Sequence, residues 1–143
     1  MAGSVVFGLD GLLANHKHRL HHIEKDPPDY RAFYGQDVVG DDGGYKSMIQ
    51  LCQQLAVSNT VIILTERPIA VSEVTRRWLK WHNIPRLAVY TRQDCKYDDV
   101  SAYKIKMLKQ FRREGFKPWL VIDCDPEVVR QARRAAGAQG LLV

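Results

Sequence analysis

Residues 5–14 have the sequence VVFGLDGLLA, and this stretch is the most informative about the fold. The run Ser4–Phe7 is β-branched and aromatic, which favours a buried strand, and it stops at Gly8. Asp10 and Gly11 follow almost at once. We therefore expect a short buried strand with a carboxylate just beyond its carboxyl end.

The same pattern, a short apolar run followed by an amphipathic stretch, recurs along the chain. Apolar runs predict strands at residues 4–7, 60–64, 87–90, 119–122 and 141–143. Helical spacing predicts helices that begin near residues 45, 71, 100 and 126. The segment up to about Gly44 is polar and histidine-rich, and Pro27–Pro28 is expected to break any regular element there. The alternation predicts an α/β fold of three layers, α/β/α, around a parallel sheet of about five strands.

Length and composition fit one domain, 1–143, in a chain of 143 residues. No apolar run approaches the roughly 18–20 residues that a membrane span needs, and the N-terminus lacks the pattern of a signal peptide. The three cysteines, Cys52, Cys95 and Cys124, have neither zinc-ligand nor CxxC spacing. The simplest expectation is a cytoplasmic protein of phage or bacterial type.

The formal net charge is +5 and the pI is about 9.2. Such a charge favours polyanionic or phosphorylated partners, although a solvated basic surface would give the same numbers. Arg130, Arg133 and Arg134, on one expected helix, present the same two alternatives: a solvated face or a contact with nucleic acid.

Polar residues stand where three of the expected strands end. Gly8-Leu9-Asp10-Gly11 follows the first strand, Thr65-Glu66-Arg67-Pro68 the second, and Asp123-Cys124-Asp125-Pro126 the fourth; the third helix adds Lys104. In a parallel sheet these ends meet at one edge, where ligands bind. Carboxylates from two strands suit Mg²⁺, while a hydroxyl, backbone N–H groups and a lysine suit phosphate. The combination predicts metal-assisted phosphoryl chemistry.

Four motifs, in order along the chain, resemble those of the haloacid dehalogenase (HAD) phosphatase superfamily. Val5–Ala14 is similar to the first motif, hhhDxDGTLA (h, hydrophobic), and Val61–Pro68 to the second, hhhhTGRP. Asp99–Leu108 resembles the DxxxKxxxL segment with one extra residue before its lysine, and Leu120–Val129 resembles hhIDDRxxVV. Within the superfamily the chain looks most like small phage phosphatases related to the 3′-phosphatase domain of phage polynucleotide kinase, a likeness that includes Arg19–Ile23.

This resemblance implies a strand order of 5-4-1-2-3, with strands numbered along the chain, and no separate cap domain. It implies an open site, which in this superfamily goes with macromolecular substrates or partners, including nucleic-acid ends. It also implies the following roles: Asp10 as general acid/base, Thr65 and Lys104 as phosphate contacts, Arg67 and Gly11 as substrate contacts, and Asp10, Asp123 and Asp125 as Mg²⁺ ligands.

Gly8 stands where the superfamily has its nucleophilic aspartate. That carboxylate attacks phosphorus and forms an aspartyl-phosphate, a step that glycine cannot perform. Three further positions depart from the motifs: Leu12 replaces Thr, Glu66 replaces Gly, and Cys124 replaces the second Asp of the last motif.

We therefore expect an impaired or inactive relative of phosphatases that act on nucleotide or polynucleotide phosphates, with weakened affinity for Mg²⁺. The alternative is a non-catalytic module that binds a phosphorylated ligand, a nucleic acid or a protein partner. Neither the ligand nor any residual turnover follows from the sequence.

Several of these residues also have a simpler structural explanation. Asp10 suits a turn, Asp125 before Pro126 suits a helix N-cap, and Thr65 suits a cap of the second helix. Arg67 could pair with a surface carboxylate, and Lys104 could lie solvated on a helix face.

Histidines and tryptophans suggest two further expectations. His16, His18, His21 and His22 lack a second cluster of zinc ligands, so we favour a basic loop over the site instead of a zinc centre. Trp78, Trp81 and Trp119 fit helix faces and a strand, and we expect them to pack in the core.

Overall fold

The computed structural model describes residues 3–143, so the first two residues of the expected 1–143 domain lie outside the described residues. A five-stranded sheet runs through the centre, and its neighbouring strands are all parallel. Its strands are β1 (Ser4–Phe7), β4 (Thr60–Pro68), β5 (Ala88–Arg92), β6 (Pro118–Asp123) and β7 (Gln139–Leu142). Their spatial order is β5-β4-β1-β6-β7, which confirms the expected α/β fold and strand order.

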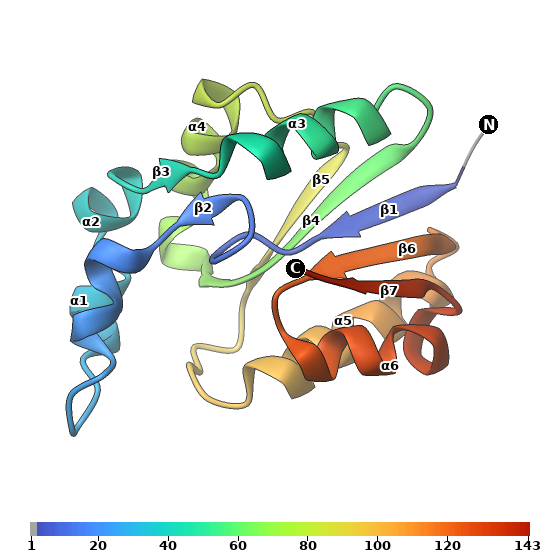
Figure 1. The fold of residues 1–143 in the computed structure, drawn as a ribbon. Helices are drawn as coiled ribbons and strands as arrows, with labels where there is room; N and C mark the ends of the chain where they lie inside the picture. Colours follow the sequence, from blue (N-terminus) through green and yellow to red (C-terminus); the bar gives the residue numbers. More distant parts are fainter. Residues whose placement is uncertain (1–2) are drawn as a thin grey trace.

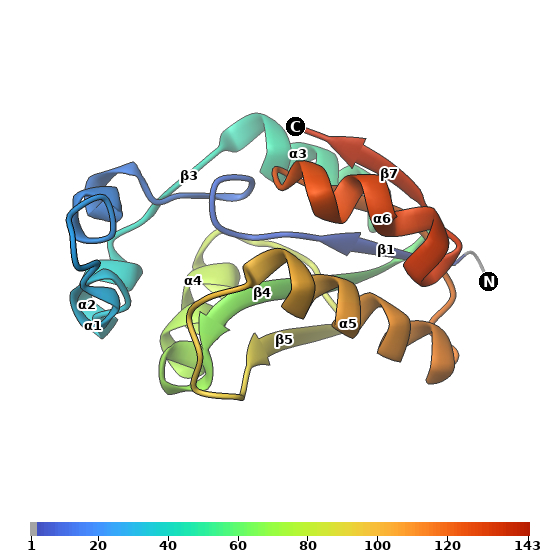
Figure 2. The same ribbon diagram turned by 90° about the horizontal axis from the view of Figure 1, so that it is seen from below.

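Two helices cover each face of the sheet (Figures 1 and 2). One face carries α3 (Lys46–Leu55) and α4 (Ser72–Trp81, after the 3₁₀ turn η2, Ile69–Val71), and the other carries α5 (Val100–Arg113) and α6 (Pro126–Ala136). Pro126 is at the start of α6, where proline is favoured because the first helical N–H has no partner within the helix. Gly137 ends α6 in the left-handed conformation, with φ 69°, which glycine adopts readily. No helix of residues 3–143 is both long and apolar enough to cross a membrane.

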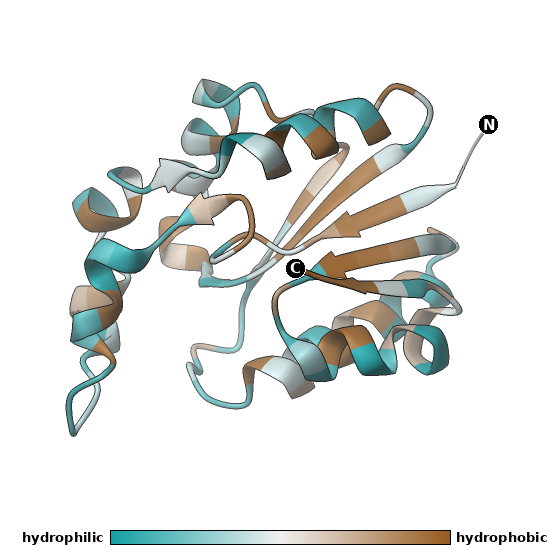
Figure 3. Cartoon of the chain, in the orientation of Figure 1, coloured by the Kyte–Doolittle hydropathy of each residue, from teal (hydrophilic) through white to brown (hydrophobic). Residues whose placement is uncertain are grey.

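The central strands are buried on both faces along their apolar runs, such as Val5–Phe7 and Val61–Leu64. Val5 and Phe7 of β1 pack toward α3 and α4, whereas Val6 packs with α5 and α6. Figure 3 shows these strands as a hydrophobic centre between helices whose outer faces are hydrophilic. The sheet is thereby held rigid, and its strand ends have fixed positions.

A small lobe lies beyond the carboxyl end of β1 (Figure 1). It holds the short ribbon of β2 (Ala14–Asn15) and β3 (Gly43–Gly44) and, between them, η1 (Lys17–His22), α1 (Tyr30–Phe33) and α2 (Gln36–Gly40). No helix or strand runs through Pro27–Pro28, as expected, but short elements form on either side of the two prolines. Helices of this length need tertiary contacts to form, and the lobe has them: Arg19 is fully buried, and Trp78 of α4 donates to the carbonyl of Asp42 at 2.7 Å.

Only one of the three tryptophans packs as expected. Trp78 is 4% exposed, whereas Trp81 is 84% and Trp119 is 46% exposed. Trp81 is the last residue of α4, and Trp119 lies at the start of β6, where its indole donates to Asn59 at 2.8 Å. Periodicity does not distinguish the middle of an element from its end, so the expectation was wrong for both.

Candidate functional site

The carboxyl ends of β1, β4 and β6 bring the predicted residues to one edge of the sheet. Gly8 and Asp10 follow β1, Thr65 and Arg67 lie in the last part of β4, and Asp123 ends β6. Lys104 reaches the same edge from the second turn of α5. Asp10, Thr65, Arg67, Lys104 and Asp123 are all buried.

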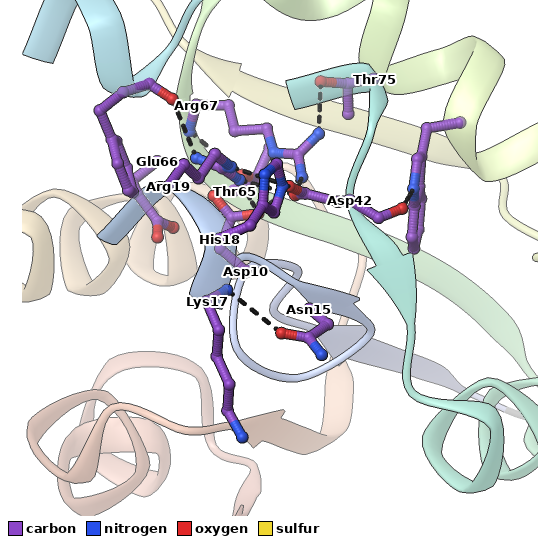
Figure 4. A network of polar contacts seen from close by, with 12 residues as sticks. Asp10, Asn15, Lys17, His18, Arg19, Asp42, Thr65, Glu66, Arg67 and Thr75 are labelled. Carbon is purple, nitrogen blue, oxygen red and sulfur yellow. Dashed lines mark hydrogen bonds and ion pairs between the residues drawn. The ribbon is translucent and has the colours of Figure 1, made fainter. Parts of the chain in front are cut away.

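Asp10 lies in a buried cluster with two arginines (Figure 4). Its Oδ1 accepts from Arg67 Nε at 3.0 Å and Nη2 at 2.6 Å, and from Arg19 Nη2 at 3.0 Å. Burial alone would raise the pKa of Asp10, but the charges of Arg67 and Arg19 outweigh it and hold that pKa well below 3.8. Asp10 is therefore ionised at neutral pH, and in this arrangement it has no proton to give to a leaving group.

Asp42, from the lobe, is the second carboxylate of this cluster. Its Oδ2 accepts from Arg19 Nη2 at 2.7 Å and from Arg67 Nη2 at 2.8 Å, and its Oδ1 accepts from Arg19 Nε at 2.9 Å. Two carboxylates and two guanidinium groups thus balance one another in a region shut off from water, which is the condition under which buried charges are tolerated.

Sequence reasoning did not find Arg19 or Asp42 as members of the site. Arg19 belongs to the segment resembling phage phosphatases, which was a usable signal, but Asp42 matches no motif. Arg67 is fully buried, and its Nη1 donates to Thr75 at 3.1 Å. The structure thus gives Arg67 protein partners where the resemblance implied a substrate.

The space beside Gly8 is filled by the side chain of Asp123. A Cβ at residue 8 would lie 2.7 Å from Asp123 Oδ2 and 2.9 Å from Asp123 Cγ. Carbon contacts are favourable at about 3.5–4.0 Å, so no larger residue fits unless Asp123 moves. The carboxylate of β6 therefore lies where a side chain from β1 would begin.

Lys104 lies between two carboxylates. Its Nζ is 2.9 Å from Asp123 Oδ2 and 3.2 Å from Glu66 Oε2. Burial would lower the pKa of Lys104, but the charges of Glu66 and Asp123 outweigh it and raise that pKa. One ammonium thus faces two carboxylates, an excess of one negative charge at the position where phosphate was expected.

Three more predicted residues have local backbone partners. Thr65 Oγ1 accepts from the N–H of Arg67 at 3.1 Å. The N–H of Gly11, which has φ 82°, donates to the carbonyl of Ala14 at 2.9 Å. Asp125 caps α6 by accepting from the N–H of Glu127 at 2.9 Å, and it also accepts from Ser101 Oγ at 2.6 Å. Of the two explanations left open for Asp125, the structure shows the helix cap.

The carboxylates proposed for Mg²⁺ do not fit a shared ion as arranged. Asp10 is bound by arginines, Asp123 by Lys104, and both oxygens of Asp125 are hydrogen-bonded. Within residues 3–143 no three His, Cys, Asp or Glu side chains are grouped so that they could hold a metal. Mg²⁺ would need at least one of these carboxylates to leave its partner.

Some polar atoms at this edge have no hydrogen-bond partner in the described chain. Asp10 Oδ2 and His16 Nδ1 are both buried and make no hydrogen bond within residues 3–143. Cys124, beside Gly11, is a poor nucleophile because burial, and then the charge of Asp123, raise its pKa to about 11. Buried polar atoms in native proteins nearly always have a hydrogen-bond partner, so Asp10 Oδ2 and His16 Nδ1 are exceptions at this edge.

Tyrosines link the lobe to the loop after β5. The Tyr97 ring stacks on Tyr30 with centroids 4.9 Å apart and on Tyr34 at 5.9 Å. These contacts join two segments that flank the edge of the sheet, so the lobe is fixed in place without forming a separate cap.

Comparison with known proteins identifies the fold. No protein-family profile and no curated protein sequence matches this chain. Among solved structures, a chain of the Pnkp1/Rnl/Hen1 RNA repair complex superposes with a TM-score of 0.73 and 20% identity, covering 99% of this chain and 42% of that chain. A chain in a second structure of this complex superposes with a TM-score of 0.72 and 21% identity, covering 99% of this chain and 45% of that chain.

A haloacid dehalogenase-like family hydrolase from Streptococcus pneumoniae superposes with a TM-score of 0.71 and 14% identity, covering 98% of this chain and 83% of that chain. The present chain spans less than half the length of the repair-complex chains. These likenesses show a HAD-like fold, as the motifs predicted.

Proposed function

We propose that this chain is a protein of HAD phosphatase fold that has lost the phosphoaspartate reaction and acts by binding a phosphorylated ligand or nucleic-acid end. The observation that carries the proposal is the side chain of Asp123 in the space beside Gly8. Position 8 offers no nucleophile, and its side-chain volume is used by a neighbour. Both observations support the proposed loss of the phosphoaspartate reaction.

The remaining groups support binding better than turnover. Asp10, the general acid that the resemblance implies, is held ionised by Arg19 and Arg67. Lys104 lies at this edge outside the arginine cluster, and phosphate binding requires that it exchange Glu66 for the ligand. Mg²⁺, the usual ion of HAD-like enzymes, is expected to bind weakly because its carboxylates already have partners.

The wild-type protein is expected to release no phosphate from p-nitrophenyl phosphate or from a 3′-phosphorylated oligonucleotide, with or without Mg²⁺. The physical reason is that no carboxylate at position 8 can form the covalent intermediate. A malachite-green assay of the purified protein checks this, with Asp123→Asn as the matched variant. Turnover that disappears in Asp123→Asn would show an active site and overturn the proposal.

Glu66→Gly should raise the affinity for inorganic phosphate by about tenfold or more, equivalent to about 1.4 kcal/mol, because it removes one of two carboxylates facing Lys104. Isothermal titration of wild type and variant measures the difference. Glu66→Gln is the isosteric comparison, and Glu73→Gln, on the exposed first turn of α4, is the control. If Lys104→Met binds phosphate as well as Glu66→Gly does, phosphate is not bound at this edge.

A further inference from the structure

The positive charge of the chain is concentrated on one face. Residues 106–117 and 127–134 contain eight basic and two acidic side chains, while the whole chain has 21 basic and 16 acidic side chains. The rest of the chain therefore has 13 basic and 14 acidic residues, so these two stretches hold more than the whole excess. We call the surface they form the α5–α6 face. All eight of its basic residues are exposed.

The basic residues come from both helices of one layer. The end of α5 and the turn after it supply Lys106, Lys109, Arg112, Arg113 and Lys117. The middle and the end of α6 supply Arg130, Arg133 and Arg134. The two helices lie side by side in both ribbon views (Figures 1 and 2).

Arg112 links the two sets of charges. Its guanidinium carbon lies 4.0 Å from where a Cβ on Gly137, the residue after α6, would stand. The arginine of α5 thus reaches the end of α6, and the two sets of basic residues meet there.

Most of these charges are not neutralised by neighbours. Arg130 pairs with Glu127 at 2.6 Å, but none of the other seven has an ion pair within residues 3–143. Two or three cations at the helix ends would suffice to complement the helix dipoles. The surplus is what a surface carries when it meets a polyanion.

The face also lacks apolar anchors. None of the exposed large hydrophobic residues belongs to either stretch. Those nearest in the chain are Trp119, two residues after Lys117, and Leu141–Val143 at the end of the chain, next to α6. A membrane surface or a protein partner would be held mainly by such residues, while a phosphate backbone needs only charge and hydrogen-bond donors. The face carries five exposed arginines, Arg112, Arg113, Arg130, Arg133 and Arg134. Four of them have no carboxylate partner within the described residues. Guanidinium groups suit phosphate oxygens because they can donate two parallel hydrogen bonds.

We propose that the α5–α6 face binds the phosphate backbone of a nucleic acid, independently of its sequence and its ends. Lys104 lies in the second turn of α5, and Arg112 is eight residues further on, about 12 Å along the helix. Lys106 is only two residues from Lys104, so the face is separated from the site that contains Gly8 and Asp123 mainly at its far end, where Arg112, Arg113 and Lys117 lie. The sheet edge would bind a phosphorylated end, and the α5–α6 face would bind the backbone of the same nucleic-acid chain.

The test uses a 30-nucleotide RNA with hydroxyl groups at both ends and measures fluorescence anisotropy at 50–200 mM salt. The variant is Lys109→Glu/Arg113→Glu/Arg134→Glu, because these side chains make no hydrogen bond within residues 3–143. We expect its affinity to fall by about tenfold or more, and the slope of log K against log salt to flatten by about two units.

The matched control is Arg76→Glu/Arg77→Glu/Lys80→Glu on α4, which changes the net charge equally on the opposite face. It should keep most of the affinity, and thermal melts should show both triple variants folded. Equal losses in the two variants, or no RNA binding by wild type at 50 mM salt, would overturn the proposal. Binding to phosphatidylserine vesicles without RNA binding would assign the face to membranes instead.

Lys104→Met separates this inference from the proposed function. The variant should lose phosphate binding at the sheet edge and keep its affinity for the hydroxyl-ended RNA. If it loses the RNA as well, the two sites are one, and the inference of a separate face is wrong.

Discussion

Arg67→Met should lower the free energy of unfolding by about 3–5 kcal/mol, the usual cost of leaving a buried charge without its partner. Arg67 is fully buried and donates to Asp10, Asp42 and Thr75. Methionine fills a similar volume but leaves Asp10 and Asp42 with Arg19 as their only remaining guanidinium partner among residues 3–143. His18 Nε2, 2.7 Å from Asp42 Oδ1, is the other side-chain contact of Asp42 within these residues. The cluster is one of the attachments of the lobe to the sheet, beside the Trp78–Asp42 hydrogen bond and the tyrosine stack, so the lobe should loosen as well. Urea unfolding followed by circular dichroism measures the change in midpoint.

Two further variants show whether charge is the cause. Arg67→Met/Asp42→Asn removes one charge of each sign and should recover a large part of the loss. Arg130→Met removes an arginine from the exposed pair with Glu127 and should leave the midpoint unchanged. If the single and double Arg67 variants unfold at the same urea concentration, lost packing and not unpaired charge explains the effect.

Gly8→Asp should not restore phosphatase activity and should destabilise the protein by about 1–3 kcal/mol, the range seen for overpacked sites. The new Cβ would meet Asp123 Oδ2 at 2.7 Å, so Asp123 must rotate away and give up its 2.9 Å contact with Lys104. The added carboxylate would join Asp123 and Glu66 around a single lysine. Thermal melts and the phosphate-release assay, each with and without Mg²⁺, test both parts of this expectation.

Gly8→Ala is the control that separates shape from charge. It adds the same Cβ without a carboxylate, so it should show the steric part of the loss only. Gly8→Asp/Glu66→Gly removes the extra carboxylate and should recover stability relative to Gly8→Asp. Turnover by Gly8→Asp alone, in the presence of Mg²⁺, would contradict the proposal that the surrounding machinery has also been lost.

Local patterns in the sequence were enough to predict the fold. Alternating apolar runs and amphipathic stretches placed all five strands of the sheet, and Pro126 and Gly137 marked the ends of α6. The motif likeness also gave the strand order. These features depend on neighbouring residues or on steric rules common to parallel sheets, so a single chain displays them.

The sequence by itself determined that position 8 has no nucleophile, because a missing side chain needs no tertiary context to be recognised. What became of the vacant space was decided only by the tertiary structure. Asp123, Lys104 and Glu66 come from three separate elements, and their pairing depends on how β6, α5 and β4 are placed to within an ångström. The same holds for Asp42, which meets Asp10 and Arg67 only because the lobe folds back over the strand ends. Periodicity is a property of neighbours in the chain, whereas these charge pairs are a property of neighbours in space.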